Sequence, residues 1–244
     1  MSVLWLDVVD STNAEARRRA EAGEAGPLWI AARRQTAGRG RRGRTWSTGE
    51  GNLAATLLTA SPLAPAQAAG VSFVAALAAA DLATTFAPEA LVTLKWPNDV
   101  LLDGRKLSGI LVESGPRPGG VWLAVGVGVN LATYPLDVEI PAAALADHLR
   151  PDQPRPPTPE EALAVLAEAF ERWAATWANA GLGAILDAWA ARAPGIPGPC
   201  RVRLPGETLD GVAEGLDTDG RLRLRLADGS QRLIAAGDVF FGGA

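Results

Sequence analysis

The stretch VLLDGRKLSGILVES, residues 100–114, predicts a β-hairpin at the centre of the chain. Its two apolar runs flank Asp103-Gly104, a dipeptide that favours the tight turn between antiparallel strands. The preceding residues 91–99, LVTLKWPND, predict a strand that Pro97 stops. Residues 119–131, GGVWLAVGVGVNL, predict another strand, whose glycines let a ligand or another backbone come close. The middle of the chain is therefore predicted to be β-structure.

Strands and helices alternate before this hairpin. Residues 4–10 alternate apolar and polar side chains, which predicts a strand. Residues 11–23 predict a helix, with Thr12 and Glu15 as a capping box and Gly23 as its stop. Ser11 and Thr12 then lie at a helix N-terminus, where they can meet a polar ligand or simply cap the helix. The other predicted segments are strands at 27–35 and 51–59 and an apolar helix at 64–86.

The pattern changes twice after residue 150. A Pro-rich connector leads to Thr158 and Glu161, which form a capping box for a helix to about residue 179, and a second helix is predicted around 182–192. The stretch APGIPGPC, residues 193–200, is the clearest linker. Beyond it, short alternating strands between Gly-rich turns predict a β-barrel close to the lower size limit for a domain. We therefore expect two domains, residues 1–194 and 198–244.

Composition excludes several classes of protein. With 48% hydrophobic and 20% charged residues in 244, the chain has the composition of a soluble globular protein. It shows no signal peptide and no membrane-spanning run, and its one cysteine, Cys200, fits a reducing compartment. We therefore expect a cytoplasmic protein that binds no membrane. One histidine and one cysteine exclude a zinc site of those ligands, and a Ser-His-Asp triad would require His148, which is better interpreted as a solvated loop histidine.

Arginine and glycine are concentrated in RRQTAGRGRRGRTW, residues 33–46. The segment holds six arginines, three glycines and no acidic residue, although the chain has a formal net charge of −4. Three interpretations are open: a nucleic-acid patch, a solvated loop without a role, and a flap that binds anions through Arg side chains and glycine N–H groups. The net charge and the lack of a helix-turn-helix pattern disfavour the first. Lysine occurs only at Lys95 and Lys106, which suggests a task for a compact ammonium group.

Several short motifs follow one another in a specific order. They are DSTN (10–13), GRGRRGRTW (38–46), GNL (51–53), KWPNDV (95–100), RKLSGILVE (105–113), GVGVN (126–130) and GDVFF (237–241). Together they resemble the biotin protein ligases over nearly the whole chain. The resemblance implies an α+β fold, with a catalytic domain of mixed β-sheet flanked by helices and a small C-terminal SH3-like β-barrel. It also implies an ATP-dependent ligase that converts biotin and Mg-ATP to biotinyl-5′-AMP and transfers the biotinyl group to a lysine of a biotin carboxyl carrier protein.

The resemblance implies which residues bind biotin. Residues 38–44 match a flap that closes over biotin and the adenylate. Lys106 matches a lysine that reaches the biotin carboxylate and the α-phosphate of ATP. The complete set of implied biotin contacts is Ser11, Thr12, Asn13 and Gln35, of which Ser11, Thr12 and Gln35 match contacts to the ureido ring, together with Gly38, Arg39, Arg41 and Lys106.

A second implied set binds ATP or the adenylate. It comprises Arg39, Arg42, Trp46, Lys95, Asn98, Lys106 and Asn130, with Trp46 packing against adenine. Lys95 is equally well interpreted as a structural cation beside the site. Lys106, Arg41 and Asp99 are the implied catalytic residues, and Asp99 either orients a cation, helps the incoming amine or is a plain turn carboxylate. No protein metal site is assigned, because Mg²⁺ arrives mainly on the ATP phosphates.

The sequence departs from the family pattern at two places. Ala54-Ala55 stands where the family often has Tyr or a hydroxyl residue, and Ser108 where it often has Ala. Both leave the shape of the biotin pocket open. The sequence also begins at the catalytic domain, so we expect neither the N-terminal helix-turn-helix of some members nor sequence-specific nucleic-acid binding.

Two rival functions stay open. A lipoate or octanoate–protein ligase of the same superfamily is disfavoured by the GRGRRGRTW loop and the C-terminal barrel. An RNA- or phosphate-binding module leaves KWPND and RKLSGIL without a role. The oligomeric state is open as well, with a homodimer as one candidate.

Overall fold

The predicted central hairpin is present in the computed structural model, which describes residues 2–242. Strand β5 (Asp99–Leu102) pairs antiparallel with β6 (Arg105–Arg117), and Leu102 lies opposite Arg105. The two turn residues, Asp103 and Gly104, have φ of 51° and 71°. Positive φ at both positions is the requirement of a type I′ turn, so the Asp-Gly prediction is confirmed.

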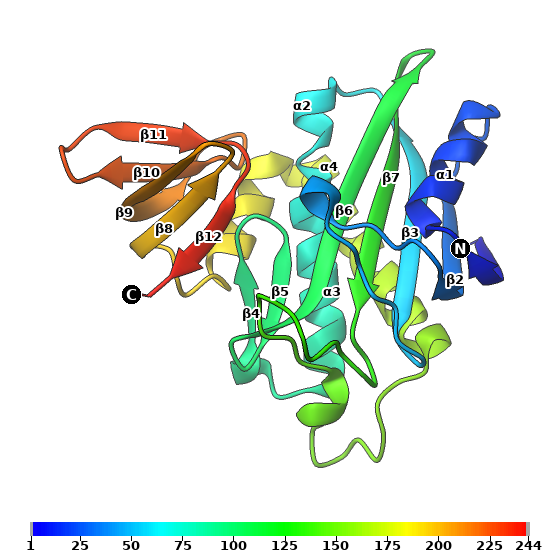
Figure 1. Ribbon diagram of the computed structural model, residues 1–244. Helices are drawn as coiled ribbons and strands as arrows, with labels where there is room; N and C mark the ends of the chain where they lie inside the picture. The colour runs from blue at the N-terminus through cyan, green and yellow to red at the C-terminus, as the bar shows by residue number, and fades with distance from the viewer. Residues whose placement is uncertain (1, 243–244) are drawn as a thin grey trace.

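The hairpin belongs to a seven-stranded sheet with the order β1-β2-β3-β7-β6-β5-β4 (Figure 1). Strands β1 and β2 are parallel, whereas the other neighbours are antiparallel, so the predicted mixed sheet is confirmed. The remaining bounds are β1 (Val3–Val9), β2 (Leu28–Gln35), β3 (Leu53–Ser61), β4 (Val92–Lys95) and β7 (Gly120–Val129). Strand β7 lies at the middle of this order, which gives its glycines a central place.

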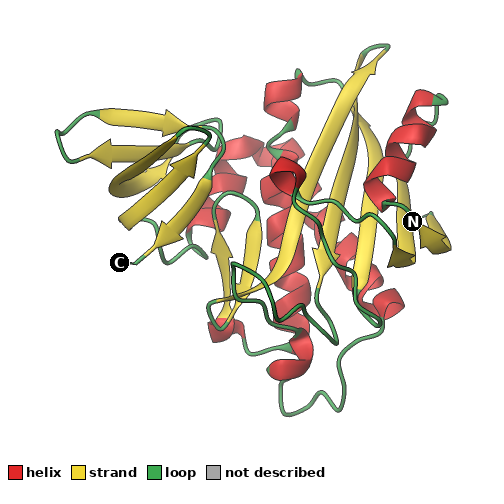
Figure 2. Cartoon of the chain, viewed as in Figure 1, coloured by secondary structure: helices red, strands yellow, loops and turns green. Residues whose placement is uncertain are grey.

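Helices cover both faces of this sheet (Figure 2). Ile30 and Leu58 pack with Ala16 of α1 (Thr12–Glu21), whereas Trp29 and Leu57, one residue earlier in their strands, join the core with α3 and α4. Alternate residues of a strand point to opposite faces, so α1 covers one face and α3 with α4 the other. The bounds are α2 (Pro65–Ala68), α3 (Val71–Phe86) and α4 (Pro159–Ala190), with short 3-10 turns η1 (Arg41–Gly43), η2 (Glu89–Leu91) and η3 (Leu145–Asp147).

The apolar stretch Pro65–Phe86 is long enough to cross a membrane, yet 67% of its most apolar window is buried inside the protein. Burial against the sheet is the environment of a core helix, which is the interpretation the sequence favours. In α4, Gly181 breaks the helical dihedrals with φ 80°, close to the predicted boundary between two helices. The Thr158–Glu161 capping box at the start of α4 is confirmed, with Glu161 N–H donating to Thr158 Oγ1 at 3.2 Å.

The capping box predicted at Thr12 and Glu15 is wrong. Ser11 is the N-cap of α1 and makes no side-chain capping bond. The Thr12 N–H donates to Gln35 Oε1 of β2 at 2.8 Å. Glu15 accepts instead from Arg18 and Arg19, at 3.0 and 2.9 Å. A tertiary acceptor therefore satisfies the N–H group that a local cap would otherwise bind.

The C-terminal barrel, residues 198–242, is an antiparallel five-stranded sheet with the order β11-β10-β9-β8-β12, and it lies beside the main domain (Figure 1). Trp96 Nε1 donates to the Gly220 carbonyl at 3.0 Å, and the buried Leu222 and Leu224 belong to the same apolar cluster as Phe73 and Trp189. The two cores are therefore continuous. The bounds are β8 (Gly198–Leu204), β9 (Glu207–Leu216), β10 (Leu222–Leu226), β11 (Gln231–Ile234) and β12 (Asp238–Phe241).

Candidate active site

A cavity of about 480 Å³ lies over the sheet and is bounded by the N-terminus of α1, the Arg/Gly segment and residues 237–240 at the start of β12, the last strand of the C-terminal barrel. Gly126 and Gly128 of β7 line its centre. Of the predicted site residues, only Gly38 and Arg42 do not line it. The others that do are Ser11, Thr12, Asn13, Gln35, Arg39, Arg41, Trp46, Lys95, Asn98, Asp99, Lys106 and Asn130.

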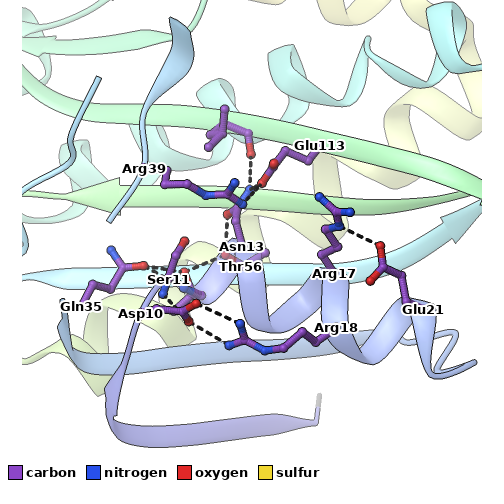
Figure 3. Close-up of polar contacts among 12 residues, drawn as sticks. Asp10, Ser11, Asn13, Arg17, Arg18, Glu21, Gln35, Arg39, Thr56 and Glu113 are labelled. Carbon is purple, nitrogen blue, oxygen red and sulfur yellow. Dashed lines mark hydrogen bonds and ion pairs between the residues drawn. The ribbon is translucent and has the colours of Figure 1, made fainter. Parts of the chain in front are cut away.

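One end of the cavity presents uncharged polar groups from α1 and β2. Gln35 Oε1, which points toward the start of α1 in Figure 3, accepts from the Thr12 N–H at 2.8 Å and from Thr12 Oγ1 at 3.2 Å. The Gln35 Nε2 donates to Thr48 Oγ1 at 3.0 Å. Thr56 Oγ1 of β3 lies 2.8 Å from Thr12 Oγ1. Ser11 is buried at the same helix start. This network fixes the positions of several uncharged hydrogen-bond donors and acceptors, as a ligand with a polar ring would require.

Asp10 fixes the start of α1 from outside the cavity. Its carboxylate accepts two bonds from Arg18, at 2.8 and 2.9 Å, and one from the Ser11 N–H at 2.8 Å. The hydrogen bonds from Arg18 are the largest influence and lower the pKa of Asp10 to about 2, while the Ser11 N–H adds to the effect. Asp10 is therefore a stable anionic anchor for the helix N-terminus.

Asn13 and Glu113 connect the helix to the Arg/Gly segment. Asn13 Nδ2 donates to Leu111 O at 3.2 Å and to Glu113 Oε2 at 2.9 Å, and the same carboxylate oxygen accepts from Arg39 at 2.9 Å (Figure 3). A side chain at Gly126 would overlap Asn13 Oδ1, which explains the glycine there. The sequence interpretation missed Glu113, although it ends the RKLSGILVE motif.

The other end of the cavity is cationic. Lys106 Nζ lies 2.6 Å from Asp99 Oδ1 in an ion pair whose side chains are 22% and 11% exposed. Lys106 Nζ is also 5.9 Å from the centre of the Trp46 ring. Asp99 and Lys106 thus form a close ion pair in the cavity wall. The pair comes from β5 and β6, the two strands of the central hairpin.

Lys95 and Arg41 add two partly buried cations. Burial lowers the pKa of Lys95, and the neighbouring charge of Lys106 lowers it further against the opposing effect of Asp99. Lys95 Nζ lies 5.3 Å from the ring centre of Phe240 in β12. Burial also lowers the pKa of Arg41, although the guanidinium stays charged at neutral pH. Arg41 donates to Asn98 Oδ1 at 2.9 Å.

The segment of residues 38–44, here called the arginine flap, contributes Arg39, Gly40, Arg41 and Arg44 to the cavity wall. An isolated bridge joins Arg39 to Thr45, and Trp46 N–H donates to Gly38 O at 2.9 Å. Gly38 packs against Trp46 and Gln35 in the flap base, where a Cβ atom would not fit. Trp46 lies directly on Gly109 and Gly128. Gly38 thus supports the base of the flap and does not line the cavity. Arg42 points to the C-terminal barrel, where it donates to Asp238 at 3.2 Å.

Two asparagines brace the loop that follows β7. Asn130 Nδ2 donates to Ala143 O at 3.1 Å. Asn52 Oδ1 accepts from the N–H groups of Leu131, Ala132 and Thr133, at 2.9, 3.0 and 3.2 Å. Residues further along this loop, 135 and 137–140, line the cavity. The sequence interpretation left Asn52 without a role, although it is the middle residue of the GNL motif.

Residues 2–242 hold no group of three His, Cys, Asp or Glu side chains placed to bind a metal ion. His148 lies elsewhere, with Nε2 2.9 Å from Arg105 and 3.6 Å from Asp103. The cavity itself places Arg and Lys cations beside a polar pocket, which suits an anionic, phosphate-bearing substrate.

Comparison with known proteins shows which family has this fold and this sequence. The chain matches the biotin/lipoate A/B protein ligase family over residues 5–130 and the biotin protein ligase C-terminal domain over residues 199–242. The chain belongs to the biotin/lipoate A/B protein ligase family. Within it, the chain is 45% identical over 237 residues to a biotin–[acetyl-CoA-carboxylase] ligase of Paracoccus denitrificans, covering 96% of this chain and 98% of the relative. It is 36% identical over 245 residues to the ligase of that name from Mycobacterium tuberculosis, covering 96% and 88%.

Solved structures show the same fold. The biotin protein ligase from Aquifex aeolicus in complex with biotin and ATP superimposes with a TM-score of 0.77 at 23% identity, covering 99% of each chain. The ligase from Leishmania major in complex with biotinyl-5-AMP gives 0.65 at 22% identity, covering 96% and 99%. The predicted family and the predicted fold class are confirmed.

Proposed function

We propose that this protein is an ATP-dependent ligase that converts biotin and ATP to biotinyl-5′-AMP and transfers the biotinyl group to a lysine of a biotin carboxyl carrier protein. One observation carries the proposal: a single cavity joins the polar pocket of α1 and β2 to the cations of β4, β6 and the arginine flap. A molecule with a polar ring and a carboxylate tail matches both ends. The relatives named as biotin–[acetyl-CoA-carboxylase] ligases support this substrate and acceptor.

In the first step a biotin carboxylate oxygen attacks the α-phosphorus of ATP, and pyrophosphate leaves with the bonding electron pair. This chemistry needs charge neutralisation and in-line positioning rather than a general base. We assign neutralisation to Lys106, Arg39 and Arg41, which all line the cavity. Magnesium enters as part of the Mg-ATP substrate.

The other proposed contacts follow the geometry of the cavity. Ser11, Thr12, Asn13 and Gln35 form the polar end and are assigned to the biotin head. The nucleotide side is assigned to Trp46, Lys95, Asn98 and Asn130.

In the second step the amine of the carrier lysine attacks the acyl carbon of the mixed anhydride, and AMP leaves. Asp99 is the one acidic side chain among the predicted site residues, and it lies 2.6 Å from Lys106. We assign it to holding that ammonium group toward the reacting carboxylate. This role makes Asp99 a positioning residue rather than a base.

Biotin-dependent exchange of labelled pyrophosphate into ATP tests the first step without any knowledge of the carrier. Exchange that requires biotin and is absent with lipoate or octanoate supports the proposal. Exchange with lipoate alone would assign the chain to the rival ligase class. Transfer is then tested with a biotin carboxyl carrier domain and a variant of that domain whose acceptor lysine is replaced by arginine.

The RNA- or phosphate-binding alternative is disfavoured by the partners of the flap. Arg39, Arg41, Arg42 and Arg44 bind Glu113, Asn98 and Asp238 within the protein. A nucleic-acid surface would present free guanidinium groups and bind RNA with a steep salt dependence.

The organisation of the protein is proposed as well. We divide the chain into a catalytic domain of residues 1–194 and a barrel domain of residues 198–244. A cytoplasmic location and a homodimer stay predictions, and sedimentation at several concentrations measures the second.

A further inference from the structure

Thr56 is a polar residue within the buried part of β3. Residues 53–58 of this strand are all buried, and the other five are apolar. The Thr56 side chain is fully shielded from solvent, and a hydroxyl in such a place costs free energy unless it is hydrogen-bonded. Thr56 does not line the cavity. The side chains that bind its hydroxyl therefore show what this hydroxyl holds in place.

Asn13 of α1 lies across a row of residues that β3, β7 and β6 place side by side. In that row, Thr56 is the register partner of Gly126, and Gly126 is the partner of Leu111. A side chain at Gly126 would overlap Asn13 Oδ1, so the Asn13 amide occupies the space that this glycine leaves open. The amide spans the row, with Nδ2 3.2 Å from the Leu111 carbonyl and Oδ1 2.8 Å from Thr56 Oγ1 (Figure 3).

The acceptors around Asn13 determine which end of its amide faces which partner. Its Nδ2 donates to the Leu111 carbonyl and, at 2.9 Å, to Glu113 Oε2. A carbonyl and an ionised carboxylate can only accept, so the amide oxygen cannot take that place. The Leu111 carbonyl is enough to impose this orientation, because it belongs to the backbone of β6. The amide oxygen of Asn13 therefore faces Thr56 as an acceptor.

The single hydrogen of the Thr56 hydroxyl then sets the direction of the next bond. Thr56 Oγ1 lies 2.8 Å from both Asn13 Oδ1 and Thr12 Oγ1, but a hydroxyl has one hydrogen to donate. Asn13 Oδ1 cannot donate, so the Thr56 hydrogen goes to Asn13, and Thr12 donates its own hydrogen to Thr56. Gln35 Oε1, at 3.2 Å, is the more distant partner for the Thr12 hydroxyl and already accepts from the Thr12 N–H. The lone pairs of Thr12 Oγ1 are then left for the cavity, which Thr12 lines.

We infer that Thr56 is a positioning residue that, held by Asn13, makes Thr12 Oγ1 a hydrogen-bond acceptor toward the substrate. The polar end of the cavity thus selects a ring that offers an N–H donor at this position and rejects a ring that offers an oxygen there. The groups that set this selection belong to α1, β3 and β6 and not to the arginine flap. The inference rests on the proposed function for the identity of the ligand, since the ureido ring of biotin carries N–H groups.

Binding of ring analogues tests the direction of this bond. The probes are biotin and the two cyclic carbamates in which one or the other ring N–H of biotin is replaced by oxygen. Isothermal titration calorimetry with the intact protein gives a dissociation constant for each. In the wild type, the carbamate whose ring oxygen faces Thr12 should bind roughly 10- to 100-fold more weakly than biotin, because two acceptors then face each other.

Thr56→Val keeps the shape of the side chain and removes its hydroxyl. Thr12 can then turn its hydrogen toward the ligand, so the discrimination between biotin and that carbamate should fall by about tenfold. Thr56→Ser restores the hydroxyl and should restore the discrimination. The KM for ATP in biotin-dependent exchange should change little in either variant, because Thr56 acts on the polar end of the cavity.

A matched control lies in α3. Thr84 Oγ1 donates to the Asp81 carbonyl at 3.0 Å, and Thr84 does not line the cavity. Thr84→Val removes a hydroxyl of the same kind and should leave the discrimination at its wild-type value. Urea unfolding of each variant shows that the titrated protein is folded.

A measurement without ligand tests the hydroxyl pair independently of the proposed function. Thr12→Val and Thr56→Val each break the bond between the two hydroxyls. The double variant should therefore lose less stability in urea than the sum of the two single losses. Additive losses would show that the hydroxyls are not bonded and would overturn the inference.

Three binding results would also overturn it. The first is equal affinity of the wild type for biotin and both carbamates, since Thr12 would then not be a fixed acceptor. The second is wild-type discrimination in Thr56→Val, which would mean that Gln35 alone holds the Thr12 hydrogen. The third is discrimination as low in Thr56→Ser as in Thr56→Val, which would assign the effect to packing. A wild-type protein that binds no biotin would refute the ligase proposal, and the stability comparison would still decide whether Thr12 and Thr56 are bonded.

Discussion

Replacement of Lys106 by alanine separates the catalytic from the structural contribution of this ammonium group. The side chain lies 2.6 Å from Asp99 and is 22% exposed. Its removal leaves the Asp99 carboxylate, which is 11% exposed, without its cation. Breaking a buried pair costs about 3 kcal/mol of stability, and partial exposure of this pair makes that figure an upper bound. Loss of a preorganised group that stabilises transition-state charge lowers the rate by about 10² to 10³.

A second substitution distinguishes the two effects. Lys106→Ala/Asp99→Asn removes both charges of the ion pair, so the unfolding free energy should recover most of its loss. Catalysis should not recover, because the cation is still missing. Lys106→Arg should rescue only part of the rate, since its fork is larger than an ammonium group and Gly109 and Trp46 confine the space around Nζ.

The assays are urea unfolding for stability and biotin-dependent pyrophosphate–ATP exchange for the first step. Parallel loss and recovery of stability and exchange across the three variants would refute the reasoning, because it would mean that Lys106 acts only by holding the fold. Near-normal exchange in Lys106→Ala would refute it directly.

Four further outcomes are expected. Arg41→Gly loses the contact with Asn98 and should retain the adenylate about tenfold less well, which a biotin blot of added albumin measures against wild type. Gly220 has φ 80°, and in Gly220→Ala the added methyl group would overlap the edge of the Phe73 ring. Urea unfolding should show a loss of about 2 kcal/mol, more than for Gly229→Ala, where φ is 84° but the space is open. Asn52→Ala leaves the three N–H groups of residues 131–133 without their acceptor and should cost about 2 kcal/mol, with a raised KM for ATP that a purely structural loss would not produce. Because the folded-state pKa of Asp238 lies below its unfolded value, its contribution is present above about pH 4 and is lost as pH falls through the folded pKa; the difference in unfolding free energy between wild type and Asp238→Asn should be constant at neutral pH and shrink in acid.

Local features of the fold were predictable because their physical causes lie within a few residues. The type I′ turn at Asp103-Gly104 depends on two adjacent dihedrals. The Thr158–Glu161 box links residues three apart. The order of motifs such as KWPND and RKLSGIL was enough to indicate the family, and most of the implied site residues line one cavity.

The sequence alone determined whether most segments form a helix, a strand or a turn, and which side chains are available for chemistry. Only the tertiary structure decided which of those groups meet. Thr12 is bound by Gln35 rather than capping its own helix. Glu113 joins Asn13 to Arg39 because α1 packs on β3 and β7, and β7 is the neighbour of β6 in the sheet. Arg42 carries the same charge as Arg41, yet it faces Asp238 of the barrel. Such pairs join residues far apart in the chain, and their meeting depends on strand order and domain docking, which no local pattern of side chains encodes.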